Sequence, residues 1–210
     1  VLLSSRAKNG LTCTHQIDAR VGRLVGSRMT DSETQLRLAR MTDEGLFERL
    51  AMAVLRESDP DYRRLIQTGV NVAGKTIKSP VDGIMFIPGA DPPHMIVVHH
   101  TTCELKRLRE KWLHVPGAKD RVPAGDLVKT AGIIADERAN DPRVQATVFL
   151  TTTQNPPEDL VRDVQAEAQR LSISVPIWSN SALSHALDTT PTGQYLRRKH
   201  LGIVEERLSA

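Results

Sequence analysis

The chain has 210 residues, of which 40% are hydrophobic, so it is long enough to bury one sizeable core. Aromatic residues make up only 3%, and a core built mainly from aliphatic side chains suits a sheet covered by helices. The formal net charge of +3 is compatible with a polyanionic partner, although a solvated basic face explains it equally well.

The cysteines and the apolar runs argue against several classes of protein. Cys13 and Cys103 form no CxxC pair, so they indicate neither a disulfide framework nor a zinc site. No apolar run approaches the roughly 18–20 residues that a membrane span requires. We therefore expect a cytoplasmic protein that does not enter a membrane.

The first part of the chain predicts an extension followed by helix. Residues 1–30 are expected to be a poorly ordered or artefactual N-terminal extension, because more domain-like sequence opens at Met29. Asp31 or Ser32 can cap a first helix, which breaks near Gly45. The stronger helix spans about 43–57 with these residues buried: Phe47, Leu50, Ala51, Val54 and Leu55.

The sequence then changes to strands and helices in alternation. Residues 70–87 predict a strand, a turn and a second strand that begins at Asp82, and residues 95–100 predict a buried strand with a polar end, His99-His100-Thr101. The remaining elements are expected to be helices at about 103–114 and 124–139, a strand at 145–151, a helix at 157–171, a strand at 172–177 and a helix at 179–188. This order indicates one α/β domain over residues 31–188.

This order of elements resembles the plan of the PD-(D/E)xK nucleases. A helix carries Glu48, a strand pair carries Asp82, and a third strand ends in polar residues. Ser79-Pro80-Val81-Asp82-Gly83 is similar to the "PD" segment, and Ile96–Thr101 occupies the place of the "(D/E)xK" strand. The resemblance implies a restriction-endonuclease-like core, with a central mixed β-sheet flanked by helices, and metal-dependent cleavage of DNA.

Phosphodiester hydrolysis requires a hard cation, and such cations take carboxylate ligands. His99 and Thr101 lie on one face of their strand and can both face Asp82, whereas His100 faces the other way. The resemblance implies that Glu48, Asp82 and His99 hold the cation, Mg²⁺ or Mn²⁺. Imidazole suits transition metals better than magnesium.

The chain departs from the family pattern on the third strand. His99 stands where the family has a carboxylate or glutamine, and Thr101 stands where it has a lysine and cannot supply a positive charge. Family members relocate this lysine onto a neighbouring helix, which points to Lys111, with Lys106 as a second candidate. We therefore predict Asp82, His99, Thr101 and Lys111 as catalytic residues.

The C-terminal segment, residues 189–210, is typical of a connector toward a missing downstream module. Its apolar residues are too sparse for a core of their own. It resembles the segment that joins N-terminal effector domains to the nucleotide-binding module of bacterial STAND NTPases, the NLR-like antiphage sensors. The resemblance to these proteins also covers four motifs earlier in the chain: Val97–Thr102, Lys111-Trp112-Leu113, Ile177-Trp178-Ser179 and Leu183–Asp188. The resemblance implies that the chain is the effector nuclease of an antiphage defence protein. Its expected partners are DNA, a downstream NTPase or sensor module, and a second copy of the chain when the protein is activated.

Each of these residues also has a simpler interpretation. Asp82 precedes a glycine and can be a turn residue, and Glu48 can be an ordinary helix glutamate. His99 and His100 can be a hydrogen-bonded pair, and Lys111 a surface lysine beside a core tryptophan. A second hypothesis is therefore a catalytically degenerate domain of the same fold that serves nucleic-acid or protein binding or regulation.

A third hypothesis is a nucleotide-binding domain. Residues 69–76, which end in Gly74-Lys75-Thr76, match the phosphate-loop pattern literally. A genuine loop follows a buried strand and opens a helix, whereas this one follows helical sequence and precedes strand sequence. The context argues against this hypothesis.

Overall fold

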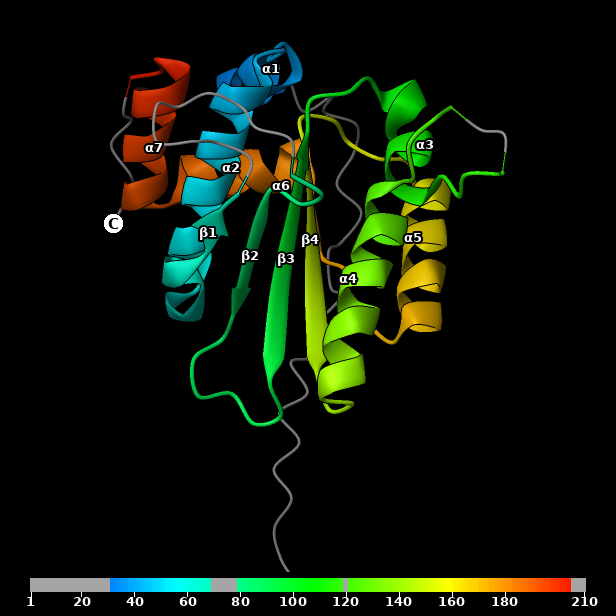
Figure 1. Cartoon of the computed structure of the whole chain (residues 1–210). Helices are drawn as coiled ribbons and strands as arrows, with labels where there is room; N and C mark the ends of the chain where they lie inside the picture. Colours follow the sequence, from blue (N-terminus) through cyan, green and yellow to red (C-terminus); the bar gives the residue numbers. More distant parts are fainter. Residues whose placement is uncertain (1–30, 69–78, 119–120, 205–210) are drawn as a thin grey trace, which may run out of the picture. The chain divides into compact units, whose positions relative to one another are not determined.

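The structure is a computed structural model that describes residues 31–68, 79–118 and 121–204 (Figure 1). Its strands form one five-stranded sheet with the order β1-β2-β3-β4-β5. The strands are β1 (Ile66–Gln67), β2 (Gly83–Phe86), β3 (His94–Thr101), β4 (Gln145–Thr152) and β5 (Ile177–Trp178). Strand β2 pairs antiparallel with both β1 and β3, and β3, β4 and β5 are parallel. The predicted α/β class with a central mixed sheet is therefore confirmed.

Helices flank this sheet on both faces. They are α1 (Glu33–Ala39), α2 (Glu44–Ser58), α3 (Leu108–Leu113), α4 (Asp126–Asn140), α5 (Glu158–Leu171), α6 (Asn180–Thr189) and α7 (Pro191–Leu201), with 3₁₀ turns at Pro60–Arg64 and Leu105–Arg107. In Figure 1, α4 and α5 lie on one side of the sheet and α2 and α7 on the other. Among the described residues, no helix is long and apolar enough to cross a membrane.

The helix starts follow the capping residues in the sequence. The Ser32 side chain accepts a hydrogen bond from the amide of Gln35, whose own side chain accepts from the amide of Ser32, which forms a capping box at α1. Asp43 accepts from the amide of Leu46 and caps α2. The predicted start of the stronger helix is confirmed, and its five predicted apolar residues are all buried.

Strand β3 lies at the centre of the sheet and separates two apolar layers. Met95 and Val97 pack under α3, α4 and α5, whereas Ile96 and Val98 pack under α2. This alternation follows from the period of two along a strand. The strand is buried on both faces, as its unbroken run of apolar residues predicts.

Some predicted elements differ or lie outside the described residues. The strand predicted at 172–177 is observed as the shorter β5, which begins at Ile177, and an isolated bridge at Ser174 precedes it. The pairing is interrupted between them because Pro176 has no amide hydrogen to donate to the neighbouring strand. Residues 69–78 lie outside the described residues, so the first strand of the predicted pair and the phosphate-loop pattern are not placed. The predicted extension at 1–30 also lies outside them.

Helix α7 lies in the segment predicted to be a connector. Leu196 and Leu201 join a core cluster with Phe47 and Leu50 of α2, and Ile203 extends it beyond the helix. These apolar residues do not form a core of their own but complete one that begins at α1. The downstream module itself stays a prediction.

We expect Leu196→Ala to lower the free energy of unfolding by about 2–5 kcal/mol, because the buried side chain leaves a cavity between α7 and α2. Urea denaturation followed by circular dichroism measures this change. Val204→Ala is the matched control, since Val204 is 79% exposed and its truncation should change stability by less than about 0.5 kcal/mol. Equal stabilities for the two variants would contradict the packing of α7 as part of the domain.

Candidate functional site

A polar pocket opens where β3 ends. It has a volume of about 160 Å³ and is lined by Glu44, Phe47, Glu48, Asp82, His100, Thr101, Thr102 and Lys111. The pocket therefore collects four of the five residues predicted for the site, which are Glu48, Asp82, Thr101 and Lys111. These come from α2, the start of β2, the end of β3 and α3.

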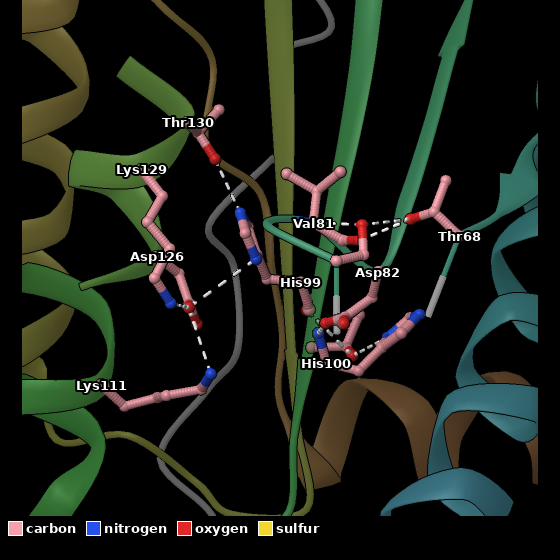
Figure 2. Close-up of polar contacts among 11 residues, drawn as sticks. Thr68, Val81, Asp82, His99, His100, Lys111, Asp126, Lys129 and Thr130 are labelled. Atoms are coloured by element: carbon pink, nitrogen blue, oxygen red, sulfur yellow. Dashed lines mark hydrogen bonds and ion pairs between the residues drawn. The ribbon is translucent and has the colours of Figure 1, made fainter. Parts of the chain in front are cut away.

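Asp82 directly precedes β2, and its carboxylate is tied to the end of β3. Its Oδ2 accepts a hydrogen bond of 2.7 Å from the backbone amide of His100 (Figure 2). Burial raises the pKa of Asp82, and the amide of His100 works against this shift. Asp82 is therefore more than a turn residue bonded to its own backbone, since it holds a strand distant in sequence.

Glu48 is buried on α2 although it is a glutamate, with an exposed fraction of only 6%. Its Oε2 has no hydrogen-bond partner among the described residues. Burial, and secondly the charge of Asp82, raise the pKa of Glu48 to about 7. Gly83 packs against the same helix, since a Cβ there would lie 2.7 Å from Cε of Met52, the end of a flexible side chain. Glu48 is thus a buried carboxyl close to a second one.

His100 lines the same pocket and was not among the predicted site residues. Its Nδ1 lies 2.6 Å from Oγ1 of Thr151, and its ring makes an edge contact with Phe47 of α2. Burial lowers the pKa of His100 to about 3, so its imidazole is neutral at physiological pH. Its Nε2 has no hydrogen-bond partner in the described part of the chain.

His99 points to the opposite face of the sheet and does not line this pocket (Figure 2). Its Nε2 lies 2.6 Å from Oγ1 of Thr130, and its Nδ1 lies 3.7 Å from Oδ1 of Asp126. Burial lowers its pKa to about 4. Helix α2, which carries Glu48, covers the face of the sheet to which His100 points, and α4 covers the face to which His99 points. The structure therefore does not bring His99 to Glu48, as the predicted metal site requires.

Lys111 reaches from α3 to the pocket and is held by a buried carboxylate. Its Nζ lies 3.1 Å from Oδ1 of Asp126, which is 1% exposed and also pairs with Lys129 at 3.3 Å. Burial acts against the ammonium form of Lys111, but Asp126 together with Asp82 outweighs it, so the pKa of Lys111 is raised. Lys111 is therefore a fixed positive charge at the pocket. Lys106, the second candidate, pairs with Glu104 and its side chain is 78% exposed.

The position of Asp126 depends on the close contact of two helices. Asp126 is the first residue of α4 and follows Gly125, where a Cβ would lie 2.6 Å from the amide nitrogen of His114. Only glycine allows this approach of α4 to the end of α3. The sequence did not distinguish Asp126 from an ordinary acidic residue in a first helical turn.

Metal coordination by several side chains is not prearranged in the described ranges. No group of three or more histidine, cysteine, aspartate or glutamate side chains there is placed to hold a metal ion. The pocket is lined by three carboxylates, of Glu44, Glu48 and Asp82, and by one imidazole, but not in a common coordination geometry.

Comparisons with models of protein families, with curated proteins and with solved structures find no match to this chain.

We expect the stability of the wild-type chain to fall relative to Glu48→Gln as the pH rises from 4.5 to about 7. The folded state keeps the Glu48 proton up to about pH 7, whereas the unfolded state releases it near pH 4.5. Protonated Glu48 therefore costs no stability below pH 4.5, and the free energy of unfolding falls as the pH rises from 4.5 to about 7. The relative change should be on the order of 1–3 kcal/mol. Urea denaturation of both proteins at a series of pH values, with a chelator present, measures it. Parallel stability curves would show that Glu48 titrates normally.

We expect Asp126→Asn to lower the free energy of unfolding by roughly 1–3 kcal/mol, because it leaves two partly buried ammonium groups without their shared carboxylate. Asp163→Asn is the matched control, since it removes an ion pair with Arg109 in which both side chains are about half exposed. Exposed pairs contribute about 0–1 kcal/mol. A smaller loss for Asp126→Asn than for the control, in thermal or urea denaturation, would contradict the structural importance of this pair.

Proposed function

We propose that the chain is a metal-dependent nuclease that hydrolyses phosphodiester bonds in DNA and has a restriction-endonuclease-like core. One observation carries the proposal: Glu48, Asp82 and Lys111, from three separate elements, line one polar pocket. Two carboxylates beside a fixed ammonium group are suited to a phosphate that accepts charge while a cation is held next to it.

The order of elements supports the same proposal. Helix α2 carries Glu48, Asp82 stands at the start of β2, and β3 runs antiparallel to β2 and ends beside Asp82. This is the arrangement that the resemblance to the PD-(D/E)xK nucleases implies for the acidic residues. The element order supports the fold assignment, and the pocket supports the activity.

The two carboxylates fit Mg²⁺ or Mn²⁺. Mg²⁺ commonly keeps several waters and uses one or two carboxylates together with substrate phosphates, so a site without three protein ligands is suitable. Glu48 and Asp82 would hold the ion, because they are close enough for Asp82 to raise the pKa of Glu48 and because Oε2 of Glu48 has no partner among the described residues. When bound, the ion would stabilise charge on the phosphate and acidify a water molecule.

The other residues of the pocket have distinct roles in this proposal. Lys111, kept protonated by Asp126, stabilises negative charge on the phosphate in place of the lysine that Thr101 replaces. Thr101 accepts a hydrogen bond from the amide of Cys103 and shapes the pocket wall. His99 fixes the end of β3 to α4 through Thr130.

The biological setting belongs to the proposal as well. The resemblance to STAND NTPases suggests an effector of an antiphage defence protein that is activated when a downstream NTPase or sensor module clusters it. Specific cleavage of DNA, rather than of RNA, rests on the same resemblance.

We expect the chain to nick supercoiled plasmid DNA with Mg²⁺ or Mn²⁺, and Asp82→Asn and Lys111→Ala to lower the rate by about 100-fold or more, since each removes charge at the reacting phosphate. Gel electrophoresis of the plasmid measures the rate. Lys106→Ala is the matched control, an exposed lysine whose loss should leave the rate within about twofold. Absence of nicking by the wild type at any tested protein concentration, with intact DNA binding, would favour the catalytically degenerate alternative.

A further inference from the structure

The imidazole of His100, a residue that lines the pocket, has one nitrogen without a hydrogen-bond partner among the described residues. Its side chain is buried, with an exposed fraction of 6%, and Nε2 has no hydrogen-bond partner among the described residues. A buried polar atom without a partner costs free energy, on the order of 1–3 kcal/mol, unless a ligand or solvent meets it. Because His100 lines the pocket, the pocket is where such a ligand would lie.

The hydrogen bonds around His100 determine what kind of ligand this nitrogen accepts. Thr151 Oγ1 donates to the carbonyl oxygen of His99 at 3.4 Å and lies 2.6 Å from Nδ1 of His100. A hydroxyl has a single hydrogen, so both contacts are hydrogen bonds at once only when that hydrogen points to the carbonyl and the imidazole proton on Nδ1 is donated to Thr151. Nε2 then has a free lone pair, as a metal-ligating histidine requires.

A second unpartnered atom lines the same pocket. Oε2 of Glu48 is also buried and has no hydrogen-bond partner in the described part of the chain. Phe47, the residue before Glu48, contacts the ring of His100, so the packing of α2 on β3 brings the glutamate and the imidazole to one wall. A nitrogen lone pair and a carboxylate oxygen are thus available together.

We propose that this pocket binds a divalent transition-metal ion of the manganese-to-nickel series through Nε2 of His100 and the carboxylate of Glu48, in preference to Mg²⁺. This inference rests on the proposed function and specifies the cation of the same site. Imidazole favours first-row transition metals, and affinity at a mixed nitrogen and oxygen site rises from Mn²⁺ to Ni²⁺, whereas Mg²⁺ prefers oxygen alone.

Two further observations agree with a ligand role for His100. Burial keeps the imidazole neutral, so protons do not compete with a metal ion for Nε2 at physiological pH. A site with two protein ligands also agrees with the absence of any group of three metal-ligating side chains in the described ranges, because water and phosphate oxygens can fill the remaining positions.

The test measures metal binding rather than cleavage. Calorimetric titration of the untagged chain with Ni²⁺, Mn²⁺ and Mg²⁺ is compared with that of His100→Asn, in which the amide nitrogen can replace Nδ1 and keep the bond to Thr151 while Nε2 is lost. We expect the substitution to weaken Ni²⁺ binding by about tenfold or more and Mg²⁺ binding by less than about twofold. Glu48→Gln should weaken the binding of all three ions.

A matched control and a spectroscopic readout separate ligation from misfolding. His94→Asn changes a half-buried histidine on the same strand that bonds Thr147 outside the pocket, and it should leave all affinities unchanged. With ¹⁵N-labelled histidine, Zn²⁺ should shift one Nε2 resonance in the wild type and in His94→Asn, and this shift should be missing from a folded His100→Asn.

The outcomes also separate this inference from the proposed function. If folded His100→Asn binds Ni²⁺ as tightly as the wild type does, and binds Mg²⁺ as tightly as well, the role of His100 is overturned. The nuclease proposal stays in place in that case if Asp82→Asn still loses metal-dependent cleavage. Binding of no divalent ion by the wild type, together with no cleavage, would overturn both.

Discussion

Burial of β3 on both faces is the constraint on which the rest of the site depends. Successive side chains of this strand point alternately toward the helices on one face of the sheet and the helices on the other. The last side chains of the strand are polar rather than apolar, so they need hydrogen-bond partners on both sides. His99 finds a hydroxyl on α4 and His100 finds one on β4. The strand can therefore be buried to its end because helix α4 and the neighbouring strand β4 supply hydrogen-bond partners there.

The partners differ, and this difference separates the two faces chemically. On the α4 side, both nitrogens of His99 face polar groups, and Oδ1 of Asp126 is shared by Lys111 and Lys129, while its Oδ2 has no hydrogen-bond partner among the described residues. On the α2 side, one nitrogen of His100 and one oxygen of Glu48 have no partner among the described residues. The α4 face thus holds Lys111 in place through Asp126, and the α2 face combines an imidazole nitrogen with a carboxylate oxygen that can bind a ligand together.

Much of the fold follows from patterns in the sequence, but the site follows only in part. Capping residues and periodicity placed α2 and β3 closely, because these signals are local. Alternation also predicted that His99 and His100 face opposite ways. Alternation does not indicate which face of the sheet α2 covers, because that depends on the packing of elements distant in sequence. For this reason the sequence led us to choose His99 rather than His100 as the partner of Glu48. Asp126 was missed because its burial depends on how closely Gly125 lets α4 approach α3.

Unpartnered polar atoms in a well-packed domain indicate what a site is for. Replacing Glu48 by an apolar residue of similar size would remove a buried carboxyl that burial and Asp82 both disfavour in its charged form. The sequence nevertheless keeps a glutamate there, next to a histidine with a free nitrogen and opposite an ammonium group that is held rigidly. A bound cation would remove the conflict, because it turns the repulsion between two carboxylates into attraction and gives the imidazole a partner. The unfavourable features of the pocket are thus those that a cation would relieve, and this is the physical argument for the metal-dependent chemistry that we propose.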